Sequence, residues 1–546
     1  MALGIALDLG TSGYRTHLVD LDREAKIIST AITMRHPLPG ANIMDHLHFW
    51  IENGSEIGHK IIVETVDKLI RLHGVDPKDV KKLSICGNPI QLSMFENIEI
   101  RDLAYAGQHM LDRLKVKRPD RKGHITTAGE IGLISLKTET EVLIPPAIRH
   151  EIGADALAMI MKSGLLERNE TCMVTDYGTN AEMGLFHDGE LYSGSAAAGP
   201  AMEGQHITHG MLASPQAISD LEIAEDGRWY NMVLDQGLKA VRSALVDPST
   251  GEVKRLSDLR ARGITGTGVV AAVALGLESG LIKLPDVDTP DRNMHFVDDI
   301  LFSELDMREA GKAMGAIRAG HRTLIHEVGI KDEDVHTMYM AGASGTYVDP
   351  IKAQTVGMVP RVLDKAVQVG NTSLMMAHDL LRDPEMLDRM QDVANSIASK
   401  HIMFATSKTF EDLYVNEISY WLEGMPMDVY NAMLETAGLD PLPPLRRPKE
   451  AYRMVSSDIP VIGDHGLRVL EEVGVYLVAE FEGCTGCGAC VRGCPEQALT
   501  IEKIGEKRFR VRVATDKCLG TACKNCEMKC PQDVYNFSEL VVEERS

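Results

Sequence analysis

The sequence has no long hydrophobic run and no surplus of basic residues. Its most apolar internal stretch, around residues 268–277, is far shorter than the about 20 residues of a membrane-spanning helix. The 57 Lys and Arg are outnumbered by 79 Asp and Glu, which gives a net charge of −22. Because such a surface repels phosphates, we expect no nucleic-acid partner. The first residues place Asp8 inside an apolar run and lack a basic segment, so we expect no signal peptide, no membrane insertion and a cytoplasmic protein.

The residues that are present describe a multidomain globular chain. At about 150 residues per domain, the 546 residues suggest three or four domains. Hydrophobic residues make up 44% and charged residues 25%, a mixture that supports packed cores and argues against a largely disordered chain. Short apolar runs with strand character alternate with helical spacing, for example at residues 4–9, 56–73 and 171–176, which predicts an α/β fold.

Eight of the ten cysteines lie between residues 484 and 530. The other two, Cys86 and Cys172, stand alone in apolar surroundings, where we expect buried thiols that act as small hydrophobic side chains. The eight form two runs, each with three closely spaced thiols and a fourth that precedes a proline. The first run is Cys484, Cys487, Cys490 and Cys494, and the second is Cys518, Cys523, Cys526 and Cys530.

This spacing is typical of two-cluster ferredoxins, in which the fourth cysteine of each run binds the other cluster. We therefore predict two [4Fe-4S] clusters, one on Cys484, Cys487, Cys490 and Cys530 and one on Cys518, Cys523, Cys526 and Cys494. Zinc is the weaker alternative because its four-cysteine sites use well-separated pairs, and disulfides do not suit a cytoplasmic chain. The second run departs from the bacterial ferredoxin pattern by two extra residues in its first gap, 519–522.

Two short patterns recur along the chain. Asp-x-Gly-Thr occurs at residues 8–11 and 176–179, each time between two segments with strand character. Gly-Asn occurs at residues 87–88 and again at 370–371. Together the two echoes suggest a fold built from two similar halves.

A proline-rich segment, Pro441–Pro448, separates these halves from the cysteine runs and predicts a stiff linker. We expect the parts on its two sides to be separable. Beyond it, Arg508, Arg510 and Arg512 alternate with apolar residues on a predicted strand. Their common face is either solvated or a docking stripe for an acidic partner.

Two glycine motifs of nucleotide-binding proteins are missing: G-x-x-x-x-G-K-[ST], and G-x-G-x-x-G at a strand-to-helix junction. The Asp-x-Gly-Thr turns still have the composition that a triphosphate requires. Glycine lets backbone N–H groups approach, and an Asp at a strand end can hold Mg²⁺. Residues 263–268 (GITGTG) open a predicted helix whose N–H groups suit an anion, unless the glycines serve packing alone. The loop 341–345 (AGASG) follows an apolar strand and suits a flat purine ring.

The order of these features, two phosphate-type turns followed by an adenosine-type loop, resembles the actin-like ATPase superfamily. More closely, several stretches are similar to the reductive activases of corrinoid proteins. These stretches are TDYGTNAEMGLF at 175–186, GSAAAGPAMEG at 194–204, GITGTGVVAAV at 263–273, AGASGTYVDP at 341–350 and VGNTSL at 369–374. The two cysteine runs resemble the branch of that family that activates corrinoid proteins of methylamine methyltransferases in methanogens.

The resemblance implies an α/β fold: a two-lobed actin-like ATPase core with a C-terminal α+β two-cluster ferredoxin-like domain. We expect lobe I at residues 1–170, lobe II at 171–409, a helical segment with the proline-rich linker at 410–473, and the ferredoxin-like domain at 474–546. The implied ligands are ATP and Mg²⁺, with Asp8 and Asp176 as catalytic residues that organise the metal and the attacking water. The other implied nucleotide residues are Gly10, Thr11, Ser12, Gly178, Thr179 and Asn180 for the phosphates, and Gly342, Ala343, Ser344 and Gly345 for the adenosine.

The implied activity is ATP-dependent one-electron reduction of an inactive Co(II) corrinoid protein to Co(I), which reactivates a corrinoid-dependent methyltransferase system. The implied partners are that corrinoid protein and a low-potential electron donor. Two other interpretations stay open from the sequence. One is an actin-like small-molecule kinase whose ferredoxin module senses redox state, and the other is an electron-transfer scaffold that binds nucleotide without turnover.

Overall fold

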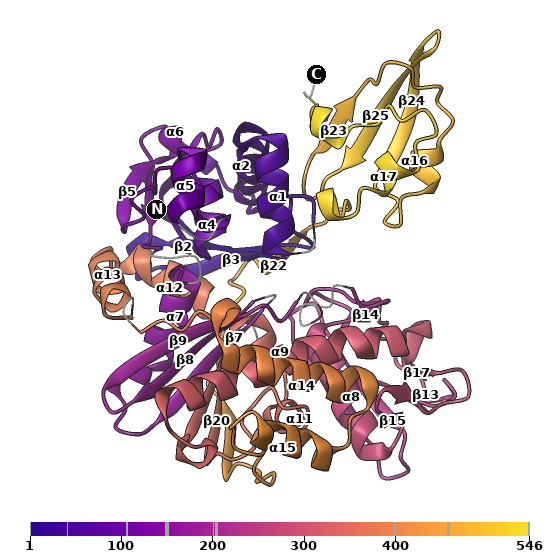
Figure 1. The fold of residues 1–546 in the computed structure, drawn as a ribbon. Coiled ribbons are helices and arrows are strands. Elements are labelled where there is room, and N and C mark those ends of the chain that lie inside the picture. The colour runs from indigo at the N-terminus through magenta and orange to yellow at the C-terminus, as the bar shows by residue number, and fades with distance from the viewer. Residues whose placement is uncertain are drawn as a thin grey trace. The chain divides into compact units, whose positions relative to one another are not determined.

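The structure is a computed structural model that describes residues 2–40, 42–104, 108–147, 152–178, 180–199, 201, 206–397, 400–455 and 459–543. It divides into two compact units. Unit 1 comprises Met1–Ala154, Ala377–Gln391 and Gly463–Ser546, and unit 2 comprises Asp155–Met376 and Asp392–Ile462. Both units combine helices and strands, as the sequence predicts (Figure 1).

The chain passes between the units in or beside three helices, α7 (Ala154–Ser163), α12 (Thr372–Arg382) and α13 (Met386–Ile397), and once more before Gly463. In the described part of the chain, no helix is both long and apolar enough to cross a membrane.

Unit 1 is built on a seven-stranded sheet around an apolar central strand. All seven residues of β1 (Leu3–Leu9) are buried, and β1 pairs antiparallel with β2 (Tyr14–Asp20) and parallel with β4 (Val80–Gly87). The strand order is β22-β3-β2-β1-β4-β6-β5, with β3 at Lys26–Thr33, β5 at His124–Thr127, β6 at Glu141–Ile144 and β22 at Leu467–Leu470. The accompanying helices are α1 (Ile43–Asn53), α2 (Ser55–Leu72), α3 (Pro89–Phe95), α4 (Arg101–Ala104), α5 (Gln108–Leu114) and α6 (Ala128–Ile131).

Unit 2 contains a six-stranded sheet with the order β21-β20-β19-β7-β8-β9. Its strands are β7 (Cys172–Tyr177), β8 (Ala181–His187), β9 (Glu190–Ala196), β19 (Thr337–Ala341), β20 (Lys365–Gly370) and β21 (Glu450–Arg453). β7 pairs antiparallel with β8 and parallel with β19, just as β1 pairs with β2 and β4. The order β3-β2-β1-β4-β6 of unit 1 thus matches β9-β8-β7-β19-β20 of unit 2, and the prediction of two similar halves is confirmed.

The two sequence echoes differ in how well they mark this repeat. The Asp-x-Gly-Thr turns follow β1 and β7, which are the equivalent central strands. Gly87 ends β4, whereas Gly370 ends β20, one strand beyond the equivalent of β4. The residue that matches Gly87 is Gly342, because each follows the residue paired with Asp8 or Asp176. The interpretation of the Gly-Asn echo is therefore wrong, since two matching residues are too few to define a register.

Between β9 and the long helix α9 (Glu304–Val328), unit 2 carries a second sheet with the order β13-β12-β11-β10-β14. Its strands are β10 (Ala217–Ile223), β11 (Trp229–Leu234), β12 (Ala240–Val246), β13 (Val253–Arg255) and β14 (Gly263–Ile264). Helix α8 (Gly266–Ser279) follows, and then two short hairpins, β15 (Ile282–Lys283) with β16 (Asp286–Val287) and β17 (Asn293–His295) with β18 (Leu301–Ser303).

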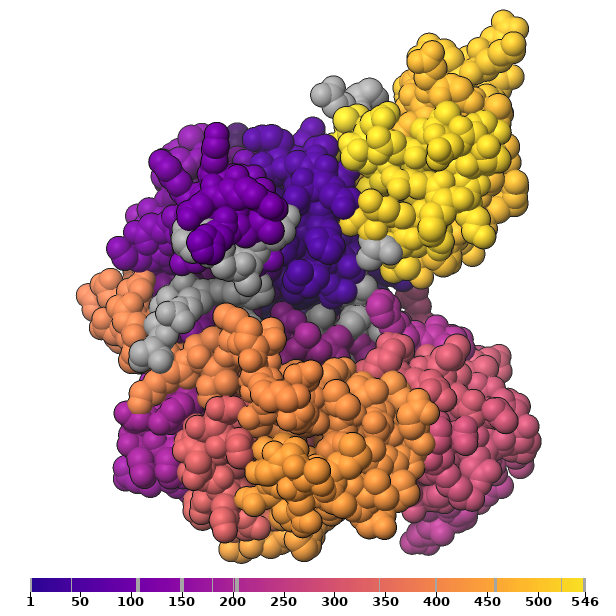
Figure 2. Space-filling view, in the orientation of Figure 1, coloured from indigo at the N-terminus to yellow at the C-terminus, as the bar shows by residue number. Residues whose placement is uncertain are grey.

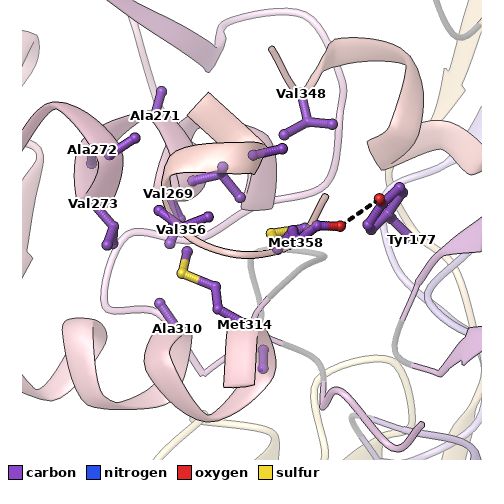
Figure 3. Packing of buried hydrophobic residues seen from close by; sticks show 14 of the residues in the cluster. Tyr177, Val269, Ala271, Ala272, Val273, Ala310, Met314, Val348, Val356 and Met358 are labelled. Carbon is purple, nitrogen blue, oxygen red and sulfur yellow. Dashed lines mark hydrogen bonds between the residues drawn. The ribbon is translucent and has the colours of Figure 1, made fainter. Parts of the chain in front are cut away.

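The apolar core of unit 2 fixes the end of its central strand. Residues 266–276 of α8 are all buried, and they pack with α9, α10 (Gly342–Tyr347) and α11 (Pro350–Thr355) (Figure 3). At the edge of this core the Tyr177 hydroxyl donates to the Met358 carbonyl at 2.8 Å. Since Tyr177 is the last residue of β7, this bond holds the strand end that carries the second Asp-x-Gly-Thr turn.

Helices α14 (Lys408–Glu423) and α15 (Met427–Thr436), orange in Figure 2, lie at the surface of unit 2. Helix α14 packs against α9. The proline-rich segment continues along the same unit. Its Pro443 carbonyl accepts from Arg361 Nε at 2.8 Å, and its Arg446 carbonyl accepts from Gln354 Nε2 at 3.0 Å. Strand β21 then extends the unit 2 sheet by pairing parallel with β20.

The proline-rich segment therefore does not lead directly into the cysteine runs. After β21 the chain adds β22 to the unit 1 sheet, parallel to β3. A chain cut near Arg453 would lose this strand together with the cysteines. The fold thus offers no clean separation point at Pro441–Pro448, contrary to the expectation from sequence.

Residues 474–543, the cysteine module, combine a four-stranded sheet with two short helices. The elements are β23 (Tyr476–Ala479), β24 (Leu499–Gly505), β25 (Arg508–Ala514), β26 (Val541–Val542), α16 (Ala489–Arg492) and α17 (Asn525–Met528), with the strand order β24-β25-β23-β26. The arginines of β25 are paired with carboxylates: Arg508 and Arg510 with Glu480, and Arg512 with Glu543 at 2.6 Å. This pairing favours a solvated face over a docking stripe.

Candidate functional site

The first Asp-x-Gly-Thr turn connects β1 to β2 in unit 1. Asp8 is buried and pairs in register with Arg15 of β2 and Cys86 of β4. Gly10 is required because a Cβ there would lie 2.7 Å from the Gly13 carbonyl oxygen. The turn is therefore tight, and a buried carboxylate lies directly before it.

Asn88 ties this turn to the end of the neighbouring strand β4. Its Nδ2 donates to Thr11 Oγ1 at 3.1 Å, and its Oδ1 caps α3 by accepting from the Gln91 amide at 2.9 Å. Sequence reasoning used Asn88 only as part of an echo and missed it as a site residue. The available signal was its place after a buried strand, because parallel strands end at the same edge of a sheet.

The second turn connects β7 to β8 in unit 2, and here the structure brings two predicted site residues together. Asp176 is half-buried and pairs with Ala341 across β7 and β19. Gly342 follows with a φ of +83°, and a Cβ on it would overlap the Asp176 carboxylate. Glycine is therefore the residue that fits beside Asp176.

The other predicted nucleotide residues lie in the same two turns and in α10. Gly345 of α10 packs against the preceding strand β19, because a Cβ there would lie 3.0 Å from the Met340 carbonyl carbon. Ser12 in the first turn is buried. Gly178 and Asn180 lie in the second turn, and Ser344 lies in α10. Thr179 and the side chain of Ala343 lie outside the described residues.

A buried imidazole supports the strand of the second turn. Thr175 Oγ1 and His321 Nε2 lie 2.7 Å apart, directly before Asp176 in the chain. Burial lowers the pKa of His321 to about 3, so the ring is neutral at physiological pH. It thus supplies a hydrogen bond without adding charge near the carboxylate.

The glycine cluster at residues 263–268 is explained by close packing. A Cβ on Gly263 would approach the His209 carbonyl oxygen, and one on Gly268 would approach the Ile218 carbonyl oxygen, each to 2.5 Å. The Thr265 hydroxyl donates to that same Ile218 carbonyl at 3.2 Å. Gly268 lets α8 lie against β10, and Gly263 lets β14 lie against residues 209–211, which supports the structural alternative rather than an anion site.

All eight thiols of the two cysteine runs are free and lie in the cysteine module. The pKa of Cys518 is raised to about 12, mainly by burial and also by the nearby thiols of Cys526, Cys494 and Cys523. Cys494, the fourth cysteine of the first run, therefore lies with the leading thiols of the second run. This neighbourhood supports the cross-over that the ferredoxin spacing predicts.

The first run forms its own group. Burial raises the pKa of Cys490, and its thiol neighbours Cys484 and Cys487 add to the shift. Within the described residues, no three His, Cys, Asp or Glu side chains converge closely enough to hold a single metal ion. Which cluster each thiol binds stays a prediction.

Backbone N–H groups point at these sulfur atoms. They donate to Cys494 Sγ and Cys518 Sγ, each at 3.3 Å. Burial acts to raise the pKa of Cys530, but the N–H groups of residues 532–535 outweigh it, and the pKa is lowered. Such donors stabilise anionic sulfur, so the thiols and their surroundings fit an iron–sulfur cluster.

Three successive parts of the chain match known protein families. Residues 3–168 match the RACo middle region, and residues 170–431 match the C-terminal domain of RACo, the ASKHA domain. Residues 483–534 match a 4Fe-4S dicluster domain. The order of an actin-like core followed by an iron–sulfur domain agrees with the sequence prediction.

Two curated relatives match over most of their length. The chain is 46% identical over 520 residues, 95% of both chains, to the [Co(II) methylated amine-specific corrinoid protein] reductase of Methanosarcina barkeri. It is 25% identical over 451 residues, 76% of this chain and 69% of the relative, to the corrinoid activation enzyme RamQ of Eubacterium limosum.

Among solved structures, the reductive activator for corrinoid,iron-sulfur protein has the same fold. It matches with a TM-score of 0.62 and 24% identity over 76% of this chain and 66% of that chain. Taken with the relative at 46% identity, the chain belongs to the family of corrinoid protein reductive activases.

Proposed function

We propose that this protein performs ATP-dependent one-electron reduction of an inactive Co(II) corrinoid protein to Co(I), and so reactivates a methyltransferase system of the methylamine type. The observation that carries the proposal is the 46% identity, over 95% of the chain, to the reductase for methylated amine-specific corrinoid proteins. The two Asp-x-Gly-Thr turns and the eight thiols supply what the reaction requires, which is nucleotide use and electron transfer within one chain.

The proposed nucleotide is ATP with Mg²⁺. Asp8 and Asp176 hold the metal and the attacking water, because each carboxylate lies one residue before the end of a central strand and close to a glycine. The turns bind the phosphates through Gly10, Thr11, Ser12, Gly178, Thr179 and Asn180, and the loop Gly342–Gly345 binds the adenosine. Asn88 joins this set through its bond to Thr11.

Two [4Fe-4S] clusters are proposed for the eight thiols. One binds Cys484, Cys487, Cys490 and Cys530, and the other binds Cys518, Cys523, Cys526 and Cys494. When bound, such clusters accept and pass on single electrons. The chain's part is to bury Cys490 and Cys526 and to direct N–H groups at the sulfur atoms.

The free energy of a nucleotide-driven conformational change is similar in size to the free energy that a weak electron donor lacks. A donor that is about 200 mV too weak leaves about 4.6 kcal/mol uncovered for one electron, from about 59 mV per tenfold change. Moving a two-state protein from 1:99 to 99:1 takes about 5.5 kcal/mol. A nucleotide-driven change in how the corrinoid protein is held therefore suffices.

The test is anaerobic visible spectroscopy of a Co(II) corrinoid protein from a methylamine methyltransferase system, mixed with this protein, a low-potential reductant and ATP. We expect Co(I) to form only when ATP is present, and Asp176→Asn to abolish that reduction without loss of iron. Asp188→Asn is the matched control, since its side chain is 90% exposed in the turn after β8. Phosphorylation of an added sugar or acid without cobalt reduction would contradict the proposal and favour a kinase.

Iron analysis tests the cofactor independently. We expect about eight iron atoms per chain after anaerobic reconstitution. Cys490→Ala should lower the iron content, whereas Cys86→Ala, at a buried thiol of unit 1 outside both runs, should not. Stoichiometric zinc without iron would overturn the assignment. The cytoplasm, where thiols stay reduced, remains the predicted compartment.

A further inference from the structure

The second cysteine run contacts the N-terminal part of unit 1 directly. The seat is the name used below for this contact of Pro39 and Gly40 with Cys518 and Gly520. The Gly40 amide donates to the Cys518 carbonyl at 2.8 Å. A Cβ on Gly520 would lie 3.3 Å from the Pro39 carbonyl group. The two extra residues in the first gap of this run belong to a short 3₁₀ turn, Gly520–Ala522, that contacts α1. The departure from the ferredoxin pattern thus lies within the contact between this run and the N-terminal part of unit 1.

The first cysteine run has no comparable seat. Within the described part of the chain, the hydrogen bonds of residues 484–494 stay inside the cysteine module. Examples are Cys487 Sγ with Gln532 Oε1 at 3.8 Å and Arg492 with the Cys487 carbonyl at 3.0 Å. The two runs are therefore unequal in their access to the rest of unit 1.

A buried glutamine lies between this seat and the first Asp-x-Gly-Thr turn. Gln91 is fully buried, and its backbone amide donates to Asn88, which in turn donates to Thr11. Its side chain reaches the other way. Gln91 Oε1 lies 3.1 Å from His36 Nε2, and Gln91 Nε2 lies 3.1 Å from His46 Nδ1. Gln91 therefore joins Asn88, which bonds to the turn, to the two imidazoles beside residues 37–40, the Gly40 loop.

The direction of these hydrogen bonds follows from the neutral imidazoles. Burial lowers the pKa of His36 to about 3, and the Leu38 amide donates to its Nδ1 at 3.1 Å. The single ring proton of His36 is therefore on Nε2 and is donated to Gln91 Oε1. The Gln91 amide then donates to His46 Nδ1, and the His36 and His46 rings stack at 3.8 Å.

The Gly40 loop is held from both sides. The Leu38 amide is bound to His36, and the Gly40 backbone lies near the His46 ring, where it opposes the lowering of that pKa by burial. Four residues after His36, the Gly40 amide bonds to Cys518. In a buried network, each donor or acceptor that loses its hydrogen-bond partner costs about 1–3 kcal/mol. A displacement of one residue in the network therefore moves its hydrogen-bonded neighbours as well.

We propose that Gln91 is a positioning residue that links the Asp8 turn to the main chain at Cys518, so that nucleotide bound at that turn acts on the second cysteine run and not on the first. The inference deepens the proposed function and rests on it, because it requires a nucleotide at the Asp8 turn. The chain of contacts is Thr11, Asn88, Gln91, His36 with His46, Gly40 and Cys518.

The first test is amide hydrogen exchange of the full-length, cluster-loaded protein with and without a non-hydrolysable ATP analogue. The Gly40 amide reports the seat directly because it forms the bond to Cys518. We expect exchange to slow at least threefold in the peptide that contains Gly40 and in residues 518–523, and to stay unchanged in residues 484–494. Unchanged exchange at Gly40 in protein that binds the analogue would overturn the inference.

The second test replaces the linking side chain. Gln91→Met keeps the length of the side chain but removes both polar atoms. We expect nucleotide affinity within threefold of wild type and no nucleotide-dependent slowing of exchange at Gly40. Thr65→Val is the matched control, because Thr65 is fully buried in the same unit and its hydroxyl bonds within its own helix to Ile61. A retained response in Gln91→Met would overturn the role of Gln91.

The two proposals fail in different ways. Protein that binds the analogue and reduces cobalt, but shows no slowing at Gly40, refutes the link and leaves the proposed function standing. Protein that binds no nucleotide refutes both. If Gln91→Met does not fold, the exchange experiment on the unaltered chain decides alone.

Discussion

The two Asp-x-Gly-Thr turns lie at equivalent places in the two units, yet different contacts support them. In unit 1 the turn is bonded side chain to side chain, from Asn88 to Thr11, with the buried polar residue Gln91 behind it. In unit 2 the turn is fitted by shape, because Gly342 leaves no room beside Asp176 and Tyr177 anchors the strand end in an apolar core. The equivalent turns are thus supported differently: in unit 1 a side-chain hydrogen bond reaches the turn itself, whereas in unit 2 the bonds of Thr175 and Tyr177 hold the strand before it.

The difference has a physical consequence. Hydrogen bonds are directional, and a buried network is satisfied in few arrangements, whereas apolar packing tolerates small shifts with little loss. Unit 2 is therefore suited to absorb a small change at its turn, while the close fit of Gly342 restrains the Asp176 carboxylate. Unit 1 is suited to pass a change at its turn to the cysteine module seated on it.

The comparison is tested most strongly by acid. Burial lowers the pKa of His17 and His36 to about 3 and of His73 to about 4, and it holds that of His46 well below 6.5, all in unit 1. Below pH 6.5 the unfolded chain binds more protons than these folded imidazoles do, so stability is lost as pH falls toward their folded pKa values. At pH 5 the protonation difference at His17, His36 and His73 lowers the stability of the fold by about 2 kcal/mol each, from about 1.4 kcal/mol per pKa unit.

Unit 2 should resist acid better, although His321 shares the same lowered pKa. Hydrogen exchange at pH 7 and pH 5, corrected for the intrinsic rate, measures the protection of β1 against that of β7. We expect β1 to lose protection by several kcal/mol more than β7. Earlier loss at β7 would show that the polar network of unit 1 is not its weak point.

The next largest effect concerns the shape of the unit 2 turn. Gly342→Ala places a methyl group against the Asp176 carboxylate and should slow ATP hydrolysis about 100-fold, similar to loss of one preorganised charge-stabilising group. Gly280→Ala is the matched control, because its φ of +76° imposes the same backbone strain, while among the described residues no neighbouring side chain or segment comes within 4 Å of the added Cβ. Both variants should lose about 1–2 kcal/mol of stability from that strain. Equal loss of ATP turnover in the two would refute the account.

A smaller effect is expected at the polar contact of unit 1. Asn88→Ser keeps a good helix cap for α3, but its shorter side chain does not reach Thr11. Loss of one hydrogen bond of about 1 kcal/mol should weaken nucleotide binding about fivefold. Calorimetric titration with the ATP analogue measures this, and an unchanged affinity would remove Asn88 from the site.

Local pattern was enough to predict the repeat and the cysteine runs. Asp8 and Asp176 each follow an apolar strand and precede a glycine turn, and that short motif fixes its own place in the sheet. The spacing of the cysteines likewise suggests their grouping, since the loop from Cys484 to Cys490 is short enough to gather its own thiols. Both signals lie within a few residues of chain.

Contacts between distant segments were not predictable in this way. Gln91 meets His36 and His46 from 55 and 45 residues away, and nothing near it in the sequence indicates those partners. The arginine face of β25 finds Glu480 on a neighbouring segment, 28 residues before Arg508. Proline predicts extended backbone but not the surface against which it lies.

The smallest effect separates the polar link of unit 1 from a merely adhesive contact. Glu52 of α1 and Lys524 of the second run form an ion pair at 3.4 Å in which both side chains are about 40% exposed. Such pairs contribute about 0–1 kcal/mol because water and salt screen them. Glu52→Gln should therefore change thermal stability by less than about 0.5 kcal/mol and leave the slowing of exchange at Gly40 by nucleotide intact, whereas Gln91→Met abolishes it. If Glu52→Gln instead removed the response, surface attraction rather than the buried glutamine would join the second run to the nucleotide turn.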